Sequence, residues 1–462
     1  MTEATAPTLG AAPSGGLGLR ACVALVIGNM IGSGIFLLPA SLAAIGPISL
    51  VGWVITSAGA LVLAILFGRL SRVVSRTGGP YAYCETGYGE FAGFVIAWGY
   101  WITLWTGNAA VTVALVGYLG FLFPAIGNSD VMGIGVALMA IWSLTLINIR
   151  GVSAAGRIQT ITTIGKLIPL LAVGLIGLFW VDMAHFTPFN QSGDTPLAAI
   201  SAAAALTLWA FLGLESATVP AGEVIEPEKT IPRATIIGVL VAAAVYISVT
   251  FVTIGVVPSP VLAQSEAPVA DVATAMWGPV GGIVIAIGAV ISTFGTLNGF
   301  TLLSGQVPYG AAVDRVFPKR LGELSEYGTP ANALVLSNLL ASVLIVMNFS
   351  QGLVGAFNVI ILLAVMSSLL PYALCAFAEL MILVRRGQSA VVPGGRTKLI
   401  VLGSLGFVYS AWAIYGSGAD TVFLGFLLLL AGVPIHVALK LRQAAEGETH
   451  DVEGNDGAGE GT

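Results

Sequence analysis

Charged residues are scarce in this chain. Lys, Arg, Asp and Glu make up 9% of its 462 residues, whereas soluble domains contain about 25%. Apolar residues reach 56% and the mean hydropathy is +0.95, so the folded chain could not cover itself with a surface compatible with water. The composition therefore excludes an ordinary soluble protein and predicts one that lies in a lipid bilayer.

Residues that build common catalytic and metal sites are also rare. The three cysteines, Cys22, Cys84 and Cys375, have no CxxC spacing, and the three histidines are scattered, so neither a disulfide framework nor a metal cluster is expected. The chain has no HExxH motif and no phosphate-binding loop, which argues against a membrane enzyme. We therefore expect no catalytic residue, no cofactor and no metal ion. Residues 1–17 lack the basic start of a cleaved signal and predict a short tail before an uncleaved span.

Long apolar runs recur from near residue 18 to near residue 440. Only helices and closed barrels satisfy the backbone in lipid, and these runs are too long and too continuous for barrel strands, so they predict membrane-spanning helices. An even number of spans places both termini on the same face. We predict twelve spans, at residues 18–45, 48–70, 91–123, 131–149, 156–181, 196–222, 234–257, 279–305, 331–348, 353–385, 397–416 and 419–440.

The cations are distributed unevenly among the predicted loops. All but one of the 18 Lys and Arg residues lie at the start of the first span, in every second loop or after the last span, whereas the alternate loops carry only acids. By the positive-inside rule, both termini are cytoplasmic. The exception is Lys166, inside the fifth span. A buried ammonium in a membrane helix is costly and by default functional; the alternative is that it reaches toward the cytoplasmic face.

Two spans contain residues that interrupt a helix. In the first span, Gly32 and Gly34 flank Ser33, and in the sixth, Gly213 and Glu215 lie at a comparable depth. A break at mid-membrane exposes backbone groups that can bind a carboxylate, although close packing through small residues also explains the first pattern alone. Paired interruptions in two halves indicate a transporter with an inverted repeat rather than a channel lined by rings of residues.

Four segments carry a family resemblance: residues 32–36, residues 78–83 with Gly87 and Gly89, residues 211–216, and residues 223–233. In these segments the chain resembles the amino acid-polyamine-organocation (APC) superfamily, and within it the basic amino acid and polyamine antiporters, closest to the bacterial arginine/agmatine antiporters. The resemblance implies an all-α polytopic membrane protein with twelve transmembrane helices, a LeuT-type 5+5 inverted repeat, and breaks in helices 1 and 6. It places the repeats at residues 18–181 and 196–385 and helices 11 and 12 at 397–440. We expect residues 441–462 to form a disordered acidic cytoplasmic tail.

The resemblance also implies a function. It implies secondary active transport of amino acids across the cytoplasmic (inner) membrane of a bacterium, by alternating access. The expected reaction is sodium-independent exchange of a cationic amino acid such as arginine for its amine or a related amino acid. The alternative is a proton-coupled permease for neutral amino acids, because Phe300 replaces a tryptophan of the arginine/agmatine antiporters and is a weaker cation-π partner. The expected partners are an amino acid or amine substrate and the lipid bilayer, not nucleic acid, and a homodimer is also allowed.

The resemblance assigns roles to individual residues. Lys166 is expected to occupy the space of the coupling sodium ion in sodium-dependent relatives, and to take part in coupling. Gating is assigned to Tyr100, Glu215 and Tyr372, although Glu215 could instead be a structural carboxylate. Independently of the resemblance, the position of Glu379 late in the tenth span, near Arg385 and Arg386, predicts an ion pair at the membrane boundary. The residues expected to bind substrate are Asn29, Ile31, Gly32, Ser33, Gly34, Asn108, Trp209, Leu212 and Phe300.

Overall fold

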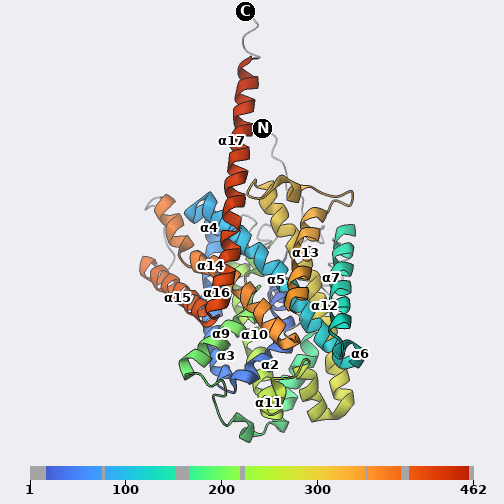
Figure 1. Ribbon diagram of the computed structural model, residues 1–462. Coiled ribbons are helices and arrows are strands. Elements are labelled where there is room, and N and C mark those ends of the chain that lie inside the picture. The colour runs from blue at the N-terminus through green and yellow to red at the C-terminus, as the bar shows by residue number, and fades with distance from the viewer. Residues whose placement is uncertain are drawn as a thin grey trace, which may run out of the picture.

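The protein is an all-helical bundle. The computed structural model describes residues 17–74, 79–151, 166–218, 224–348, 352–386 and 395–456, and within them the only extended pairing is an isolated bridge between Leu17 and Val224. Figure 1 shows the helices packed into one bundle, with α17 (Gly432–Asp456) projecting from one end and α11 (Ser259–Leu262) at the opposite end. This is the polytopic α-helical architecture that the sequence predicts.

The helices follow the predicted spans closely. Within the described residues, nine helices are long and apolar enough to cross a membrane, and the bent pair α1 and α2 makes a tenth. Two shorter apolar helices, Lys166–Trp180 and Ala331–Met347, occupy the predicted fifth and ninth spans; the earlier part of the fifth lies outside the described residues. The other helices of the bundle are α1 (Leu19–Met30), α2 (Ser33–Ile45), α3 (Ser49–Val73), α4 (Pro80–Tyr88), α5 (Glu90–Leu122), α6 (Pro124–Gly127), α7 (Asp130–Arg150), α9 (Pro196–Leu208), α10 (Pro227–Val256), α12 (Pro268–Val313), α13 (Ala331–Asn348), α14 (Leu353–Arg386), α15 (Gly395–Gly416) and α16 (Ala419–Leu430).

Several helix boundaries differ from the prediction. The eighth span is expected at residues 279–305, and α12 does bend just before it, at Gly278, whose φ of 74° suits glycine and few other residues; however, α12 already begins at Pro268 and continues to Val313. The seventh span is expected from residue 234, but α10 begins at Pro227. The prediction of disorder after residue 440 is wrong up to Asp456, because α17 continues the last span as a helix. Ala444 and Ala445 have high helix propensity and follow the apolar part without a helix breaker between them.

The loops form two groups. Within each group, loops that are far apart in the sequence contact one another. Among the cation-bearing segments, Arg72 Nε donates to the Glu228 carbonyl at 2.8 Å, and Gln443 Nε2 donates to the Arg315 carbonyl at 2.7 Å. Lys440, near the end of the last span, forms an ion pair with Glu90 at the start of α5. These contacts place the cation-bearing loops on one side of the bundle, as the charge pattern predicts.

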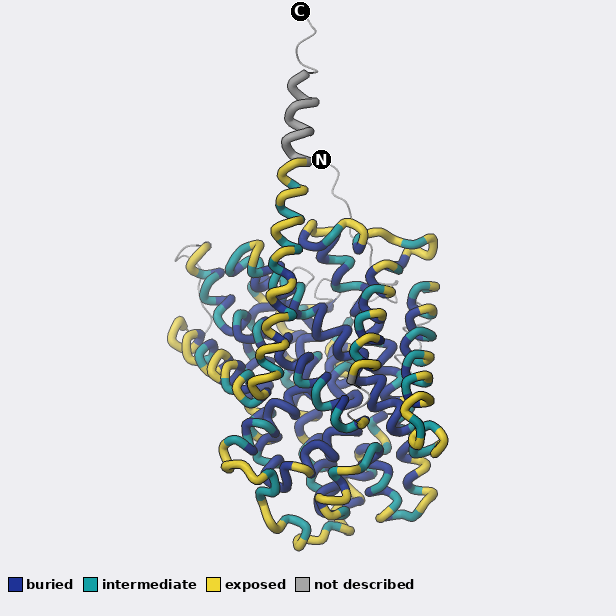
Figure 2. Tube along the Cα trace, in the orientation of Figure 1, coloured by how far each residue is buried: buried dark blue, intermediate teal, exposed yellow. Residues whose placement is uncertain are grey.

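The acid-bearing loops meet at the other side. Phe189 accepts a backbone hydrogen bond from Ile48 at 2.8 Å, and Gly255 accepts one from Asp182 at 2.9 Å. The centre of the bundle is buried, and exposed residues lie on its outer helices and loops (Figure 2). Many of the exposed side chains are large and apolar, for example Phe179 at 87% exposure, as expected of a surface that faces lipid.

Candidate functional site

The first break separates α1 from α2 by only two residues. The two helices meet at an angle of 40°, and no side chain caps the start of α2 at Gly32. The first amides of α2 have no acceptor within their own helix, and the buried hydroxyl of Ser33 has no hydrogen-bond partner among the described residues. A Cβ atom at Gly32 would lie 2.7 Å from Cγ2 of Thr296, so glycine is required for close packing on α12. Among the described residues, the break therefore leaves the Ser33 hydroxyl unpartnered beside amides that their own helix does not satisfy.

The break in the sixth span is longer and satisfies many of its own groups. After α9 ends at Leu208, residues 209–211 form a 3-10 turn, residues 212–215 are irregular, and Ser216–Thr218 form a second 3-10 turn. Gly213 has a φ of 97°, which lets the chain reverse locally. The Thr218 hydroxyl donates to the Glu215 carbonyl at 2.7 Å, and the Tyr246 hydroxyl of α10 donates to the Ala210 carbonyl at 2.8 Å. Side-chain hydroxyls thus replace the lost helical hydrogen bonds.

The two breaks contact each other beside a small cavity. A Cβ atom at Gly34 would lie 3.1 Å from the Ala210 side chain, and one at Gly213 would lie 3.2 Å from that of Asn29. The cavity has a volume of 20 Å³, about enough for one water molecule. An amino acid therefore needs side chains to move before it can enter. The cavity is lined by Asn29, Tyr100, Thr103, Leu104, Leu212, Gly213, Glu215, Ser216, Phe300 and Leu303.

Two predicted substrate residues form an aromatic pair, of which Phe300 lines this cavity and Trp209 lies behind it. The rings of Trp209 and Phe300 have centroids 6.1 Å apart and are inclined by 47°. Gly107 of α5 leaves room for both, because a Cβ atom there would lie 2.7 Å from the Phe300 ring and 3.2 Å from the Trp209 ring. Aromatic faces in a desolvated site can hold a cation.

The three residues predicted to gate the site come together. The Tyr372 hydroxyl donates to Oε2 of Glu215 at 2.9 Å, and the Tyr100 side chain also approaches the Glu215 carboxyl. Glu215 and Tyr372 are both 1% exposed. The group joins α14, the sixth-span break and α5, so its hydrogen bonds close the bundle on one side of the cavity.

Lys166 lies fully inside the bundle. Its side chain is among the largest of the fully buried ones, and its Nζ donates to the Gly28 carbonyl in the last turn of α1. No amide of its own helix donates a hydrogen bond to that carbonyl, because it lies in the last turn. A cation at a helix C-terminus also interacts favourably with the helix dipole. The position favours a role at the first break over the alternative of reaching toward the membrane surface.

Asn108 lies apart from the cavity lining. Its amide nitrogen donates to Oδ1 of Asn338 at 2.8 Å and to the Ser304 hydroxyl at 3.3 Å, so it belongs to a polar cluster between α5, α12 and α13. Three of the residues predicted to bind substrate line the cavity: Asn29, Leu212 and Phe300. Four others form the adjacent break: Ile31, Gly32, Ser33 and Gly34. Sequence reasoning named Gly213 only as part of the break and did not assign Thr103, Leu104, Ser216 or Leu303 to the site; the three-residue helical spacing from Phe300 to Leu303 could have identified the last of these.

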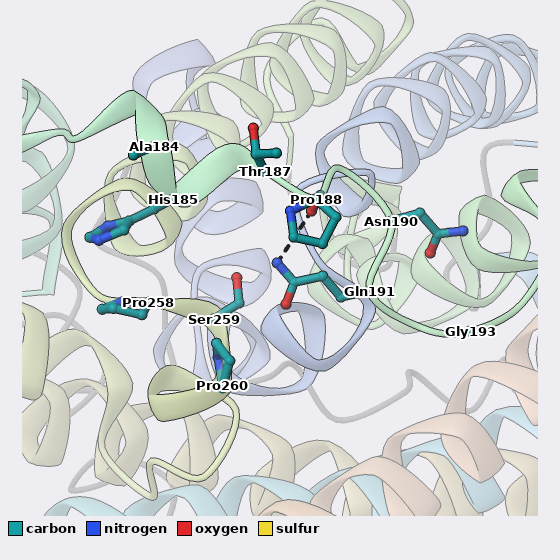
Figure 3. Close-up of a pocket in the computed structure, with 10 residues that line it drawn as sticks. All are labelled: Ala184, His185, Thr187, Pro188, Asn190, Gln191, Gly193, Pro258, Ser259 and Pro260. Atoms are coloured by element: carbon teal, nitrogen blue, oxygen red, sulfur yellow. Dashed lines mark hydrogen bonds between the residues drawn. The ribbon is translucent and has the colours of Figure 1, made fainter.

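A larger cavity of 590 Å³ lies among the acid-bearing loops, away from both breaks. Figure 3 shows its lining side chains, including His185, Asn190 and Gln191 from one loop and Ser259 from α11. Gln191 donates to the Pro188 carbonyl at 3.3 Å, and His185 contacts the Gly255 carbonyl at 2.9 Å. None of the residues predicted to bind substrate lines it, so volume alone does not locate the site.

Known proteins match this chain along most of its length. The sequence profile of the amino acid permease family matches residues 17–436. The arginine/ornithine antiporter of Pseudomonas aeruginosa is 33% identical over 92% of this chain and 91% of its own length. The putrescine transporter of Escherichia coli is 32% identical over 91% of this chain and 95% of its own, and the cadaverine/lysine antiporter of that species is 36% identical over 77% and 81%. The chain is a helical membrane bundle with two facing breaks, and the family profile matches it along almost its whole length. It belongs to the amino acid permease family.

Proposed function

We propose that the protein exchanges cationic amino acids, such as arginine, for their amines or for related amino acids across the bacterial inner membrane. The observation that carries the proposal is the contact between the two breaks beside a small cavity, with the unpartnered Ser33 hydroxyl in the first break and Trp209 of the second break packed near Phe300. The named relatives exchange or transport arginine, ornithine, lysine and diamines, which share a cationic side chain. The chemistry of the site suits the same class of substrate.

The proposed binding mode places the substrate between the two breaks, in the space that opens when the side chains around the small cavity move. The carboxylate binds the amides at the start of α2 and the Ser33 hydroxyl, because a helix N-terminus attracts an anion. The cationic side chain lies against Trp209 and Phe300. Asn29 and Leu212 complete the lining. Asn108 would contact the substrate only if its side-chain amide broke its hydrogen bond to Asn338.

The proposed transport cycle is alternating access. Residues 18–181 and 196–385 form two inverted repeats, each with a break in its first helix, and both termini lie in the cytoplasm with the cation-bearing loops. Tyr100, Glu215 and Tyr372 close the path on the side that bears the cations. Their hydrogen bonds must break when the cavity opens there.

Lys166 supports exchange without sodium. Its ammonium occupies the space between the fifth span and the last turn of α1 and bonds to a backbone oxygen, the type of ligand that a sodium ion would need. When it is protonated, this side chain repels a second cation at close range. We therefore propose that transport needs no sodium gradient.

The test is uptake of labelled arginine into proteoliposomes that are either empty or preloaded with arginine, ornithine, lysine or a diamine. We expect uptake only into preloaded vesicles, and the same rate when sodium is replaced by choline. Protein-free vesicles provide the background. Uptake of neutral amino acids into empty vesicles, driven by an acidic exterior, would establish the proton-coupled permease instead. A strict requirement for sodium would overturn the role given to Lys166.

A further inference from the structure

A buried ion pair lies beyond the gating residues. Arg69 near the end of α3 donates to both oxygens of Glu379 in α14, at 2.9 Å from Nε and 2.7 Å from Nη2. The two side chains are only 14% and 5% exposed, and the residues are 310 positions apart in the sequence. The sequence-based expectation that Glu379 pairs with its neighbouring arginines is therefore wrong, because its two oxygens bind Arg69 on another helix.

The pair continues a series of contacts along one face of α14. Tyr372, Cys375 and Glu379 follow at helical spacings of three and four residues, so they lie on the same face. Tyr372 contacts Glu215, the Cys375 sulfur lies 3.4 Å from that of Cys84 in α4, and Glu379 contacts Arg69. Seven residues of helix rise by about 10 Å, so the ion pair lies well beyond the Tyr372 contact, toward the cation-bearing loops.

The energetics of a buried pair suit a contact that forms and breaks. The desolvation of both charges offsets much of their attraction, so the paired and the hydrated states differ little in free energy. Removing one partner, by contrast, leaves an uncompensated buried charge, which is strongly unfavourable. A pathway that admits water on this side would hydrate both groups and allow them to part.

We propose that Arg69 and Glu379 are positioning residues that form a second closure on the cytoplasmic side, separate from the Tyr100, Glu215 and Tyr372 group. The proposal rests on the alternating-access function proposed above. When the pair is formed it holds α14 against α3, and inward opening requires it to separate. The competing explanation is a static ion pair that stabilises the fold in every state of the cycle.

The neighbouring cysteines provide a reporter of closure that needs no substrate. In a Cys22→Ala background, copper phenanthroline with dioxygen takes two electrons and two protons from the Cys84 and Cys375 thiols as one S–S bond forms. Because the sulfurs are 3.4 Å apart when α4 and α14 are in contact, the rate of cross-linking reports how often this side is closed. Thiols left unreacted are counted after denaturation with a maleimide mass label.

The decisive variant removes both charges, so that neither is left unpaired. In the double variant Arg69→Gln with Glu379→Gln, we expect cross-linking to slow by about five-fold or more, the lower range for contacts that couple two states. We also expect a weaker apparent affinity for external arginine. The charge-swapped pair, Arg69→Glu with Glu379→Arg, should restore both readouts. Arg69→Lys keeps the charge but loses the two-point geometry and should give a smaller change.

Arg72→Gln is the matched control. It removes a cation one turn further along α3, but Arg72 is exposed and bonds to the Glu228 carbonyl in the first turn of α10 rather than to α14, so both readouts should be unchanged. A folded double-neutral variant that cross-links and exchanges at wild-type rates overturns the closure. If that variant does not fold, wild-type cross-linking in Arg69→Lys overturns it instead. A wild-type protein that cross-links but does not exchange arginine contradicts the proposed substrate and leaves this inference standing.

Discussion

Each of the two helix breaks leaves backbone groups without helical hydrogen bonds, and the two breaks differ in how these groups are satisfied. The break between α1 and α2 is abrupt, and the start of α2 has no side-chain cap, while Lys166 binds the last turn of α1. The sixth-span break extends over about ten residues, and hydroxyls from Tyr246 and Thr218 bind its carbonyls. The first break thus keeps donors free for a ligand, whereas the second is internally satisfied and carries the carboxyl of Glu215. We infer that the first break binds the substrate and that the second break changes its hydrogen bonds in response.

The largest effect is expected when the acid of the second break is neutralised. Glu215→Gln keeps the shape but weakens the hydrogen bonds from Tyr372 and Tyr100, so exchange should fall by about 100-fold, near the upper range for coupling between two states. Binding of labelled arginine to the purified protein should remain. If binding and thermal stability fall together with exchange, Glu215 is a structural carboxylate and the division between the two breaks fails.

A smaller loss is expected at the first break. Lys166→Met keeps most of the side-chain volume but leaves the Gly28 carbonyl without its donor, a cost of about 1–3 kcal/mol for a buried group. Exchange should fall by about ten-fold and its dependence on pH should change, as measured in vesicles over a series of pH values. Unchanged uptake and an unchanged pH profile would count against any role for Lys166 in coupling.

The internal bonding of the second break can be tested at Tyr246. Tyr246→Phe removes only the hydroxyl that binds the Ala210 carbonyl, so the protein should lose about 1 kcal/mol of stability and exchange by about five-fold. Tyr409→Phe is a matched control, because that buried hydroxyl has no hydrogen-bond partner among the described residues. Equal effects of the two substitutions would show that the break does not depend on its bound hydroxyls.

The smallest effect is expected outside both breaks. Burial, with a contribution from Asp130, raises the pKa of Glu266 above its ordinary value. The folded protein therefore holds this proton more tightly than the unfolded chain, and the resulting stability is lost as the pH rises through the raised pKa. Glu266→Gln should raise the melting temperature slightly at neutral pH and have no effect near about pH 3, where the carboxyl is protonated in both states. A lower melting temperature of this variant at neutral pH would contradict a raised pKa of Glu266.

The sequence predicts the fold and the breaks well because local features determine them. Gly32, Gly34 and Gly213 interrupt otherwise apolar helices, and the charge pattern isolates Lys166 without knowledge of any contact. Features that depend on distant partners could not be read in this way. Nothing near Glu379 indicates that its partner is Arg69, and nothing near Asn108 indicates that its amide binds Asn338. The roles of individual site residues remain predictions for the same reason.

Gly107 gives the site a means of changing its selectivity. It does not line the cavity, yet its missing side chain is what allows Phe300 and Trp209 to lie where they do. Any side chain at residue 107 would displace the Phe300 ring, and one direction open to that ring is the cavity itself. Substrate range in this protein could therefore shift by the addition of a single carbon atom, without the loss of any group that binds the backbone of the amino acid.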